Sequence, residues 1–167
     1  IGYERPAIVI ISNGGLFQVL GSTSISEDST APSSVTVTGQ GSRFESENNT
    51  VYIGNYGEGS LNVLNGATAS LNSTYVGTAT LANGGKITTT EQVYIAQLNG
   101  SFGTLNIGAG ALDPAAAPGT LEAPSLRFGN GNGLINFNLL GSTTFTPELI
   151  GHGNINVIAG TTTFVTD

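Results

Sequence analysis

Hydrophobic and polar residues alternate along this chain in short stretches, and Gly or Asn follows almost every stretch. A first motif reads apolar–polar–apolar before the turn, as in Val35-Thr36-Val37-Thr38-Gly39. Its clearest copies lie at 35–39, 61–66, 81–85 and 105–108, with an earlier copy at 9–15 and looser copies at 135–137 and 155–157. A period of two predicts half-buried β-strands, because successive side chains of a strand point to opposite faces. Gly and Asn mark the corners, since both tolerate the positive φ of a sharp turn.

A second motif is interleaved with the first, and it carries Tyr or Arg between two residues that are apolar except for Thr74. It begins as Val51-Tyr52-Ile53-Gly54 and recurs at 74–77, 93–96 and 126–129. Corner residues of the first motif stand at 13, 39, 65, 83 and 108, at intervals of 26, 26, 18 and 25. The second motif ends at 54, 77, 96 and 129, and its long last interval contains a loop insertion near 113–119 that carries two prolines. Two motifs that keep step in this way indicate an internal repeat.

Each repeat contains two or three short strands and cannot bury its apolar side alone. Stacked units pair their strands in parallel, and the inward residues then form one continuous core. The sequence therefore predicts an all-β fold, a parallel β-helix (solenoid) of roughly seven coils without substantial helix. A single repeat domain spans residues 1–167, with the clearest repeats at 35–167. The alternative is an antiparallel hairpin sandwich, which has no reason to repeat the same tripeptides.

The composition agrees with many short strands and excludes long helices. Gly, Asn, Ser and Thr are poor residues for a helix interior, and they make up 77 of the 167 positions. The apolar fraction of 38% is enough for a core and too high for a disordered chain of this polarity. The chain has no Cys, which excludes a disulfide scaffold, thiolate catalysis and Cys-ligated zinc.

The charge balance excludes two classes of partner. The formal net charge is −7, and the 4 Lys and Arg residues are too few for clustered phosphate contacts. We therefore expect no nucleic-acid partner and no binding to an anionic membrane surface. No apolar run reaches the roughly 18–20 residues of a membrane-spanning helix. The first residues lack the basic end and the apolar run of a signal peptide.

Several stretches resemble a known family of exported proteins. The segments 37–44 and 51–63 are similar to the repeat shared by type V secretion autotransporters and PEP-CTERM-associated proteins. The segments 119–129, 133–138 and 155–163 resemble the passenger of autotransporters related to the AIDA and antigen 43 adhesins. The resemblance covers residues 35–167 well and residues 1–34 loosely.

This resemblance implies a right-handed β-helical passenger, displayed outside a Gram-negative cell after export through its own outer-membrane barrel. The family's barrel and signal peptide are missing here, so we expect an excised passenger segment. The implied function is that of a non-catalytic adhesin for self-association, biofilm formation or adhesion to a host-surface protein or glycan. The alternatives are a structural stalk that presents an active region elsewhere and a carbohydrate-active enzyme.

Acidic residues with a catalytic pattern are not evident in the sequence. Glycoside hydrolysis requires two carboxylates that face one another across the bond. The Asp residues lie on predicted loops or at a terminus, and the Glu residues near corners share no motif. The acidic residues considered are Asp28, Asp113, Asp167, Glu45, Glu47, Glu58 and Glu91.

The one His and one Gly-rich stretch are also interpreted as structural. Gly151-His152-Gly153 matches a short motif of polygalacturonases, but the companion motifs of that family are absent, so His152 is interpreted as a turn residue. The stretch 129–133 leads into a strand instead of a helix, which favours a corner over a phosphate or calcium loop. We predict no catalytic residue, no cofactor and no bound metal.

Outward residues of the second motif form a first candidate interaction surface. If Val51 and Ile53 point inward, the residue between them points outward. This outward place is taken in successive coils by Tyr52, Tyr75, Tyr94 and Arg127. Stacked rings with a guanidinium at one end suit contact with a sugar or a protein. The alternative is that the stacking only stabilises successive coils.

The first motif supplies a second candidate surface, an uncharged polar stripe. Between its inward apolar residues lie Thr36, Asn62, Thr80, Asn106, Asn136 and Asn156. Such a stripe can bond to the same stripe of another molecule, with exposed hydrogen bonds worth about 0.5–1.5 kcal/mol each. The alternative is a solvated face on which Asn and Thr bond within the molecule.

Overall fold

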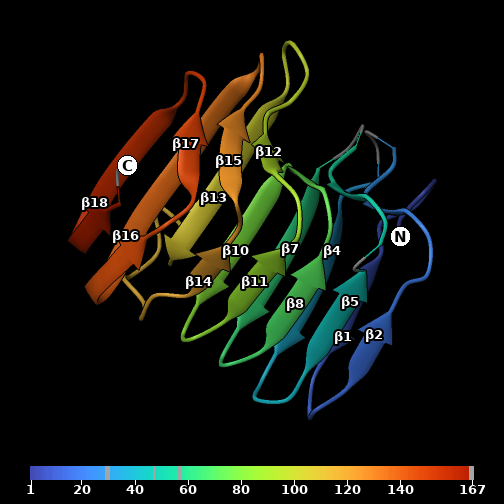
Figure 1. Ribbon diagram of the computed structural model, residues 1–167. Coiled ribbons are helices and arrows are strands. Elements are labelled where there is room, and N and C mark those ends of the chain that lie inside the picture. The colour runs from blue at the N-terminus through green and yellow to red at the C-terminus, as the bar shows by residue number, and fades with distance from the viewer. Residues whose placement is uncertain (29–30, 47, 56–57, 166–167) are drawn as a thin grey trace.

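The computed structural model describes residues 1–28, 31–46, 48–55 and 58–165, and these ranges contain strands, turns and bends. The predicted all-β class is confirmed, and no helix that could cross a membrane occurs in these ranges. Figure 1 shows the strands in stacked rows, with the N-terminus and the C-terminus at opposite ends of the stack.

The strands form three sheets. Sheet A contains β1 (Ile8–Ile11), β4 (Ser33–Thr38), β7 (Gly59–Leu64), β10 (Thr78–Ala82), β13 (Phe102–Gly108), β16 (Asn132–Phe145) and β18 (Asn154–Phe164). Sheet B contains β2 (Leu16–Gln18), β5 (Arg43–Ser46), β8 (Thr68–Leu71), β11 (Lys86–Thr89) and β14 (Thr120–Glu122). Sheet C contains β3 (Thr23–Ile25), β6 (Val51–Ile53), β9 (Thr74–Val76), β12 (Val93–Ile95), β15 (Ser125–Phe128) and β17 (Glu148–Ile150).

From β1 to β15 the chain passes through sheets A, B and C in the same order, and we call one such passage a coil. Each strand pairs in parallel with the strand in the next coil, for example Val35 with Leu61. All pairs between named strands of the described ranges are parallel, so the antiparallel sandwich considered as the alternative is wrong. A repeat that folds into stacked parallel strands explains why the two sequence motifs keep step.

The core runs along the inside of the stack. At one inward position of sheet A, equivalent residues of successive coils are Val35, Leu61, Ala79, Leu105 and Ile135. Each of them is at most 1% exposed. Burial of apolar area at about 25 cal/mol per Å² is the main stabilising term here, and each coil is stable only against its neighbours.

The corners of the first motif lie where the sequence places them. Asn13, Asn65 and Asn83 have φ of 55°, 56° and 53°, and Gly39 and Gly108 have φ of 87° and 90°. The second motif also ends in positive φ at two of its four corners, Gly54 and Ala96.

The predicted insertion near 113–119 is a loop between β13 and β14, and it folds back onto β16. The Asn138 Nδ2 atom donates hydrogen bonds to the carbonyl oxygens of Gly110 and Asp113, both at 2.8 Å. Ala116 forms an isolated parallel bridge with Leu139. These bonds attach the insertion to the coil that follows it.

The C-terminal strands differ from the short strands that the sequence pattern predicts. β16 has 14 residues and β18 has 11, because each continues past a glycine of positive φ, Gly141 or Gly160. Beyond these glycines the two strands pair again, from Ser142 with Thr161 to Phe145 with Phe164. The rings of Phe137, Phe145 and Phe164 pack edge to face, with centroids 5.4–6.0 Å apart.

Candidate functional site

The predicted tyrosine row lies on the outer face of sheet C. Tyr52, Tyr75 and Tyr94 pair in register on β6, β9 and β12, and both ring pairs have centroids 4.9 Å apart. The interplanar angles are 16° and 10°, so the rings are stacked. Arg127 of β15 continues the row, because it pairs in register with Tyr94 and is exposed. The structure therefore brings these four residues together.

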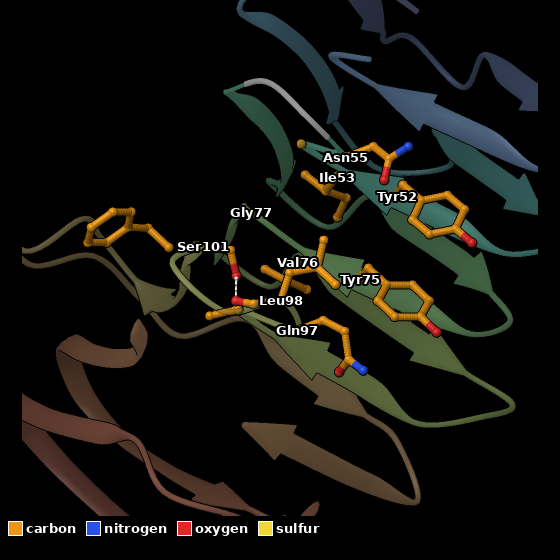
Figure 2. A pocket seen from close by; sticks show the side chains of 12 residues that line it. Tyr52, Ile53, Asn55, Tyr75, Val76, Gly77, Gln97, Leu98 and Ser101 are labelled. Carbon is orange, nitrogen blue, oxygen red and sulfur yellow. Dashed lines mark hydrogen bonds between the residues drawn. The ribbon is translucent and has the colours of Figure 1, made fainter. Parts of the chain in front are cut away.

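Stacking decides which part of each tyrosine meets solvent. Figure 2 shows the rings of Tyr52 and Tyr75 parallel to each other, with both hydroxyl groups at the same side. The ring faces cover one another, and the row presents ring edges and hydroxyl groups outward. Burial raises the pKa of the Tyr75 phenol, and its neighbours Tyr94 and Tyr52 raise it further, because a phenolate between them is disfavoured.

A groove of about 330 Å³ lies beside this row, where sheet C turns toward sheet A. Figure 2 shows Val76 and Gly77 in the middle, with Asn55 on one side and Gln97 and Leu98 on the other. Val76 ends β9, and the other four residues lie in the corners that follow β6, β9 and β12, three successive strands of sheet C. The groove therefore crosses three coils.

The groove arises because the corners that follow β6, β9 and β12 differ in length. Only Gly77 separates β9 from β10, whereas residues 54–58 separate β6 from β7 and residues 96–101 separate β12 from β13. In the stack, the one-residue corner at Gly77 comes between two corners with more residues, and the groove lies there. A Cβ atom on Gly77 would lie 2.5 Å from the carbonyl oxygen of Ile53, so the chain makes this close passage only with glycine.

The groove combines aromatic, apolar and amide groups. Among the described residues, none that lines it is Asp, Glu, Lys, Arg or His. Leu98 is 59% exposed and Phe102 is 77% exposed at its rim. The Oε1 atom of Gln97 is buried and has no hydrogen-bond partner within the described part of the chain. The Asn55 Nδ2 atom donates to Glu27 Oε1 at 3.1 Å, which orients the Asn55 amide.

The predicted Asn and Thr stripe lies on the outer face of sheet A, and its side chains bond to one another. The Asn136 Nδ2 atom donates to Asn106 Oδ1 at 2.9 Å, and Asn156 Nδ2 donates to Asn136 Oδ1 at 3.1 Å. Asn106 Nδ2 donates to the hydroxyl of Thr80 at 3.2 Å. The stripe is therefore a hydrogen-bonded ladder across coils.

The N-terminal part of this ladder is looser. Asn62 Nδ2 donates to the hydroxyl of Thr36 at 3.4 Å, and Asn62 pairs in register with Thr80. Exposure also changes along the ladder, since Asn106 and Asn136 are only 7% and 2% exposed. Their polar groups serve the molecule itself, and the remaining members are half-buried or, at Asn156, exposed.

The side chains considered for catalysis lie on different elements of the fold. His152 lies exposed in the bend between β17 and β18, and Asp113 lies exposed in the insertion. Glu45 on β5 forms an ion pair with Arg43, with Nε and Oε1 3.4 Å apart. Glu47 and Asp167 lie outside the described residues. The described residues contain no group of three or more His, Cys, Asp and Glu side chains that could hold a metal ion.

The groove residues Asn55, Gln97, Leu98 and Phe102 were not identified from the sequence as a site. The signal that points to them is the one short interval of 18 residues between the corners Asn65 and Asn83. A coil of 18 residues must have at least one shortened corner. The shortened corner leaves a hollow between its longer neighbours.

Comparison with known proteins identifies a distant relative. No protein-family model matches the chain, and no solved structure matches it. The chain is similar to the "Uncharacterized protein YuaQ" of Escherichia coli (strain K12), at 29% identity over 189 residues. The aligned region covers 91% of this chain and 14% of that protein, so the chain spans about a seventh of the length of the relative it matches.

Proposed function

We propose that this chain is a segment of a non-catalytic adhesin passenger, folded as a right-handed parallel β-helix of roughly seven coils. The seven strands of sheet A and the repeated passage through three parallel sheets support the β-helix. A right-handed sense is supported by the handedness that parallel strand connections adopt in nearly all proteins. The resemblance of the segments 37–44 and 51–63 to autotransporter repeats supports display on a Gram-negative cell surface.

The outer face of sheet C carries the adhesive role in this proposal. The row of Tyr52, Tyr75 and Tyr94 presents hydroxyl groups at regular spacing, and an uncharged groove opens beside it. Aromatic side chains with a polar end are enriched at contact surfaces, because they bury area and still form hydrogen bonds. The partner is a second copy of the protein or a protein or glycan of the host surface.

Replacement of all three tyrosines by Ser tests this role. We expect cells that display the variant to lose aggregation and surface adhesion, whereas a triple Tyr→Phe variant keeps its stacked rings and separates the hydroxyl contribution. A matched control replaces Thr68, Ser70 and Thr88 on the outer face of sheet B by Ala. If the Ser variant is folded and its aggregation and glycan binding are unchanged, sheet C is not the contact surface.

A second candidate function is a structural stalk that holds an active region away from the cell. The ladder on sheet A favours it, because Asn106 and Asn136 use their amides within the molecule and stiffen the stack. Deletion of residues 34–77 distinguishes the two functions. Ser34 pairs with Ser60 and Ser60 with Thr78, so joining Ser33 to Thr78 removes two coils and keeps the register. An adhesin loses binding with its tyrosines, whereas a stalk keeps the specificity of the longer protein.

A further inference from the structure

The groove between Asn55 and Gln97 has the features of a binding site with a defined ligand chemistry. We propose that it binds an uncharged saccharide, a short neutral glycan whose hydroxyl groups bond to the amides and whose C–H face packs on Phe102. This inference deepens the proposed adhesive function of sheet C and rests on it, because it names the chemistry that the surface recognises.

The amide oxygen of Gln97 supports a saccharide ligand because it has no hydrogen-bond partner among the described residues. A buried acceptor without a donor costs about 1–3 kcal/mol, and such groups are rare in folded proteins. The Oε1 atom of Gln97 is buried and lacks a partner among the described residues, and Gln97 is one of the residues that line the groove. A ligand hydroxyl that donates to this oxygen would remove the penalty, so the site is completed by a hydrogen-bond donor.

The exposed apolar rim of the groove, formed by Leu98 and Phe102, also supports a saccharide ligand. Leu98 and Phe102, which line the groove, are 59% and 77% exposed. They stand at the end of the same corner that carries Gln97. An aromatic ring next to amide groups suits a ligand with one apolar face and a polar edge, which describes a pyranose ring.

The charges of the groove and of the chain favour a neutral polar ligand over an anionic one. Among the described residues, the lining of the groove contains no cation to pair with an acid. Glu27, an anionic side chain outside the lining, accepts a hydrogen bond from the lining residue Asn55. With a net charge of −7 on the chain, an anionic ligand is repelled and a neutral one is not.

The size of the groove favours a saccharide over a peptide. About 330 Å³ lies at the lower end of the range of roughly 300–1,000 Å³ seen for small-molecule sites. Its lining includes the polar side chains of Asn55, Gln97 and Ser101, and the Ser101 hydroxyl donates to the carbonyl oxygen of Leu98 at 2.6 Å, which leaves the two amides for a ligand. An extended peptide would also need an unpaired strand edge, and β6, β9 and β12 are each paired on both sides.

Calorimetry on the full chain tests the proposal with neutral and acidic probes. Lacto-N-tetraose represents a host glycan, dextran represents a bacterial polysaccharide, and sialyllactose carries a carboxylate. We expect a neutral probe to bind and sialyllactose to bind more than about tenfold more weakly. Whichever neutral probe binds more tightly identifies the source of the natural ligand.

Two groove variants and two matched controls make the result specific. Gln97→Leu keeps the size of the side chain and removes the unpartnered oxygen, so we expect unchanged or higher stability together with more than about tenfold weaker binding. Phe102→Ala should weaken binding by a similar factor. Gln40→Leu and Tyr3→Ala, at exposed sites outside the groove, should change binding less than about twofold.

Three results would overturn the inference. They are absence of binding to either neutral probe, binding that Gln97→Leu and Phe102→Ala leave unchanged, and binding confined to an apolar peptide probe. The proposed function is judged separately by the triple Tyr→Ser variant. Loss of cell aggregation in that variant without any saccharide binding would reject this inference and leave the adhesive role in place.

Discussion

The outer faces of sheets A and C follow the same repeat, yet they use their polar side chains differently. On sheet A, Asn136 donates to Asn106 and accepts from Asn156, so the amides bond to one another across coils. On sheet C, the rings of Tyr52 and Tyr75 stack, and their hydroxyl groups point outward beside a groove.

This difference follows from the chemistry of the two side chains. An amide carries both donors and acceptors, so a column of identical amides can satisfy itself when coils stack in register. A stacked phenol buries its ring faces and keeps its hydroxyl group outside the stack. Sheet A therefore uses its amides mainly for cohesion between coils, whereas the Tyr52 and Tyr75 hydroxyl groups of sheet C point out of the stack.

The largest expected effect is on stability, from a change in the buried part of the ladder. Asn136→Ala removes a donor from Asn106 and an acceptor from Asn156, and Asn106 is only 7% exposed. We expect a loss of about 2–4 kcal/mol in the free energy of unfolding, measured by urea denaturation, because a buried amide oxygen is left unpaired.

Asn62→Ala is the control in the half-buried part of the same ladder. Its bond to Thr36 is longer, at 3.4 Å, and water can replace it, so we expect a loss of no more than about 1 kcal/mol. Equal losses for the two variants would show that the burial of the ladder on sheet A does not decide its contribution.

The second-largest expected effect is a loss of stability on sheet C, and its size depends on how many rings each tyrosine stacks on. Tyr75 stacks on two rings, and Tyr52 stacks on one. At about 0.5–1.5 kcal/mol per aromatic pair, Tyr75→Ala should cost about 1–3 kcal/mol and Tyr52→Ala about half as much. Urea unfolding of the two single variants measures the ratio, and a larger loss at Tyr52 would contradict a ladder held by ring stacking.

A smaller effect appears at high pH. The folded state raises the pKa of Tyr75 above its ordinary value of about 10, chiefly through burial. The unfolded chain therefore loses this proton first. The contribution to stability is complete below about pH 10 and is lost as the pH rises through the folded pKa.

Urea unfolding across this pH range, together with phenolate absorbance, measures the loss. Tyr75→Phe cannot ionise and should remove the part of the pH dependence that comes from this residue. If the wild type and this variant lose stability in parallel, the folded structure does not raise the pKa of Tyr75.

The smallest expected effect belongs to the outer face of sheet B, where Lys86 on β11 and Glu122 on β14 form an ion pair. The Lys86 Nζ and Glu122 Oε2 atoms are 2.6 Å apart, and both side chains are well exposed. The hydrogen bond from Lys86 lowers the pKa of Glu122. Stability from this pair is complete above the unfolded pKa of about 4.3 and is lost as the pH falls through the lower folded pKa.

Because solvent and salt screen an exposed pair, we expect Glu122→Gln to cost no more than about 0.5 kcal/mol at neutral pH. Acid titration of stability in low and high salt provides the measurement. A loss greater than that of Asn136→Ala would reverse the order of the three faces.

Much of the fold could be predicted because its signals are local. The corners at Asn13, Gly39 and Asn65 need positive φ, which few residues adopt, and the alternation between them marks the inward positions. The alignment of Tyr52, Tyr75 and Tyr94 follows once equivalent corners are stacked. The long strands β16 and β18 could not be predicted, because Gly141 and Gly160 look like ordinary corners in the sequence.

For the candidate sites, too, some features follow from the sequence and others only from the tertiary structure. The sequence by itself determined which residues are inward, which are outward and which columns they share, since periodicity and corner residues specify register. Only the tertiary structure decided that Asn106 and Asn136 are buried and bonded to each other, whereas the buried oxygen of Gln97 meets no donor within the described ranges. Burial and hydrogen-bond partners depend on the lengths of neighbouring coils, and the groove beside Gly77 lies where a short coil is stacked between longer ones.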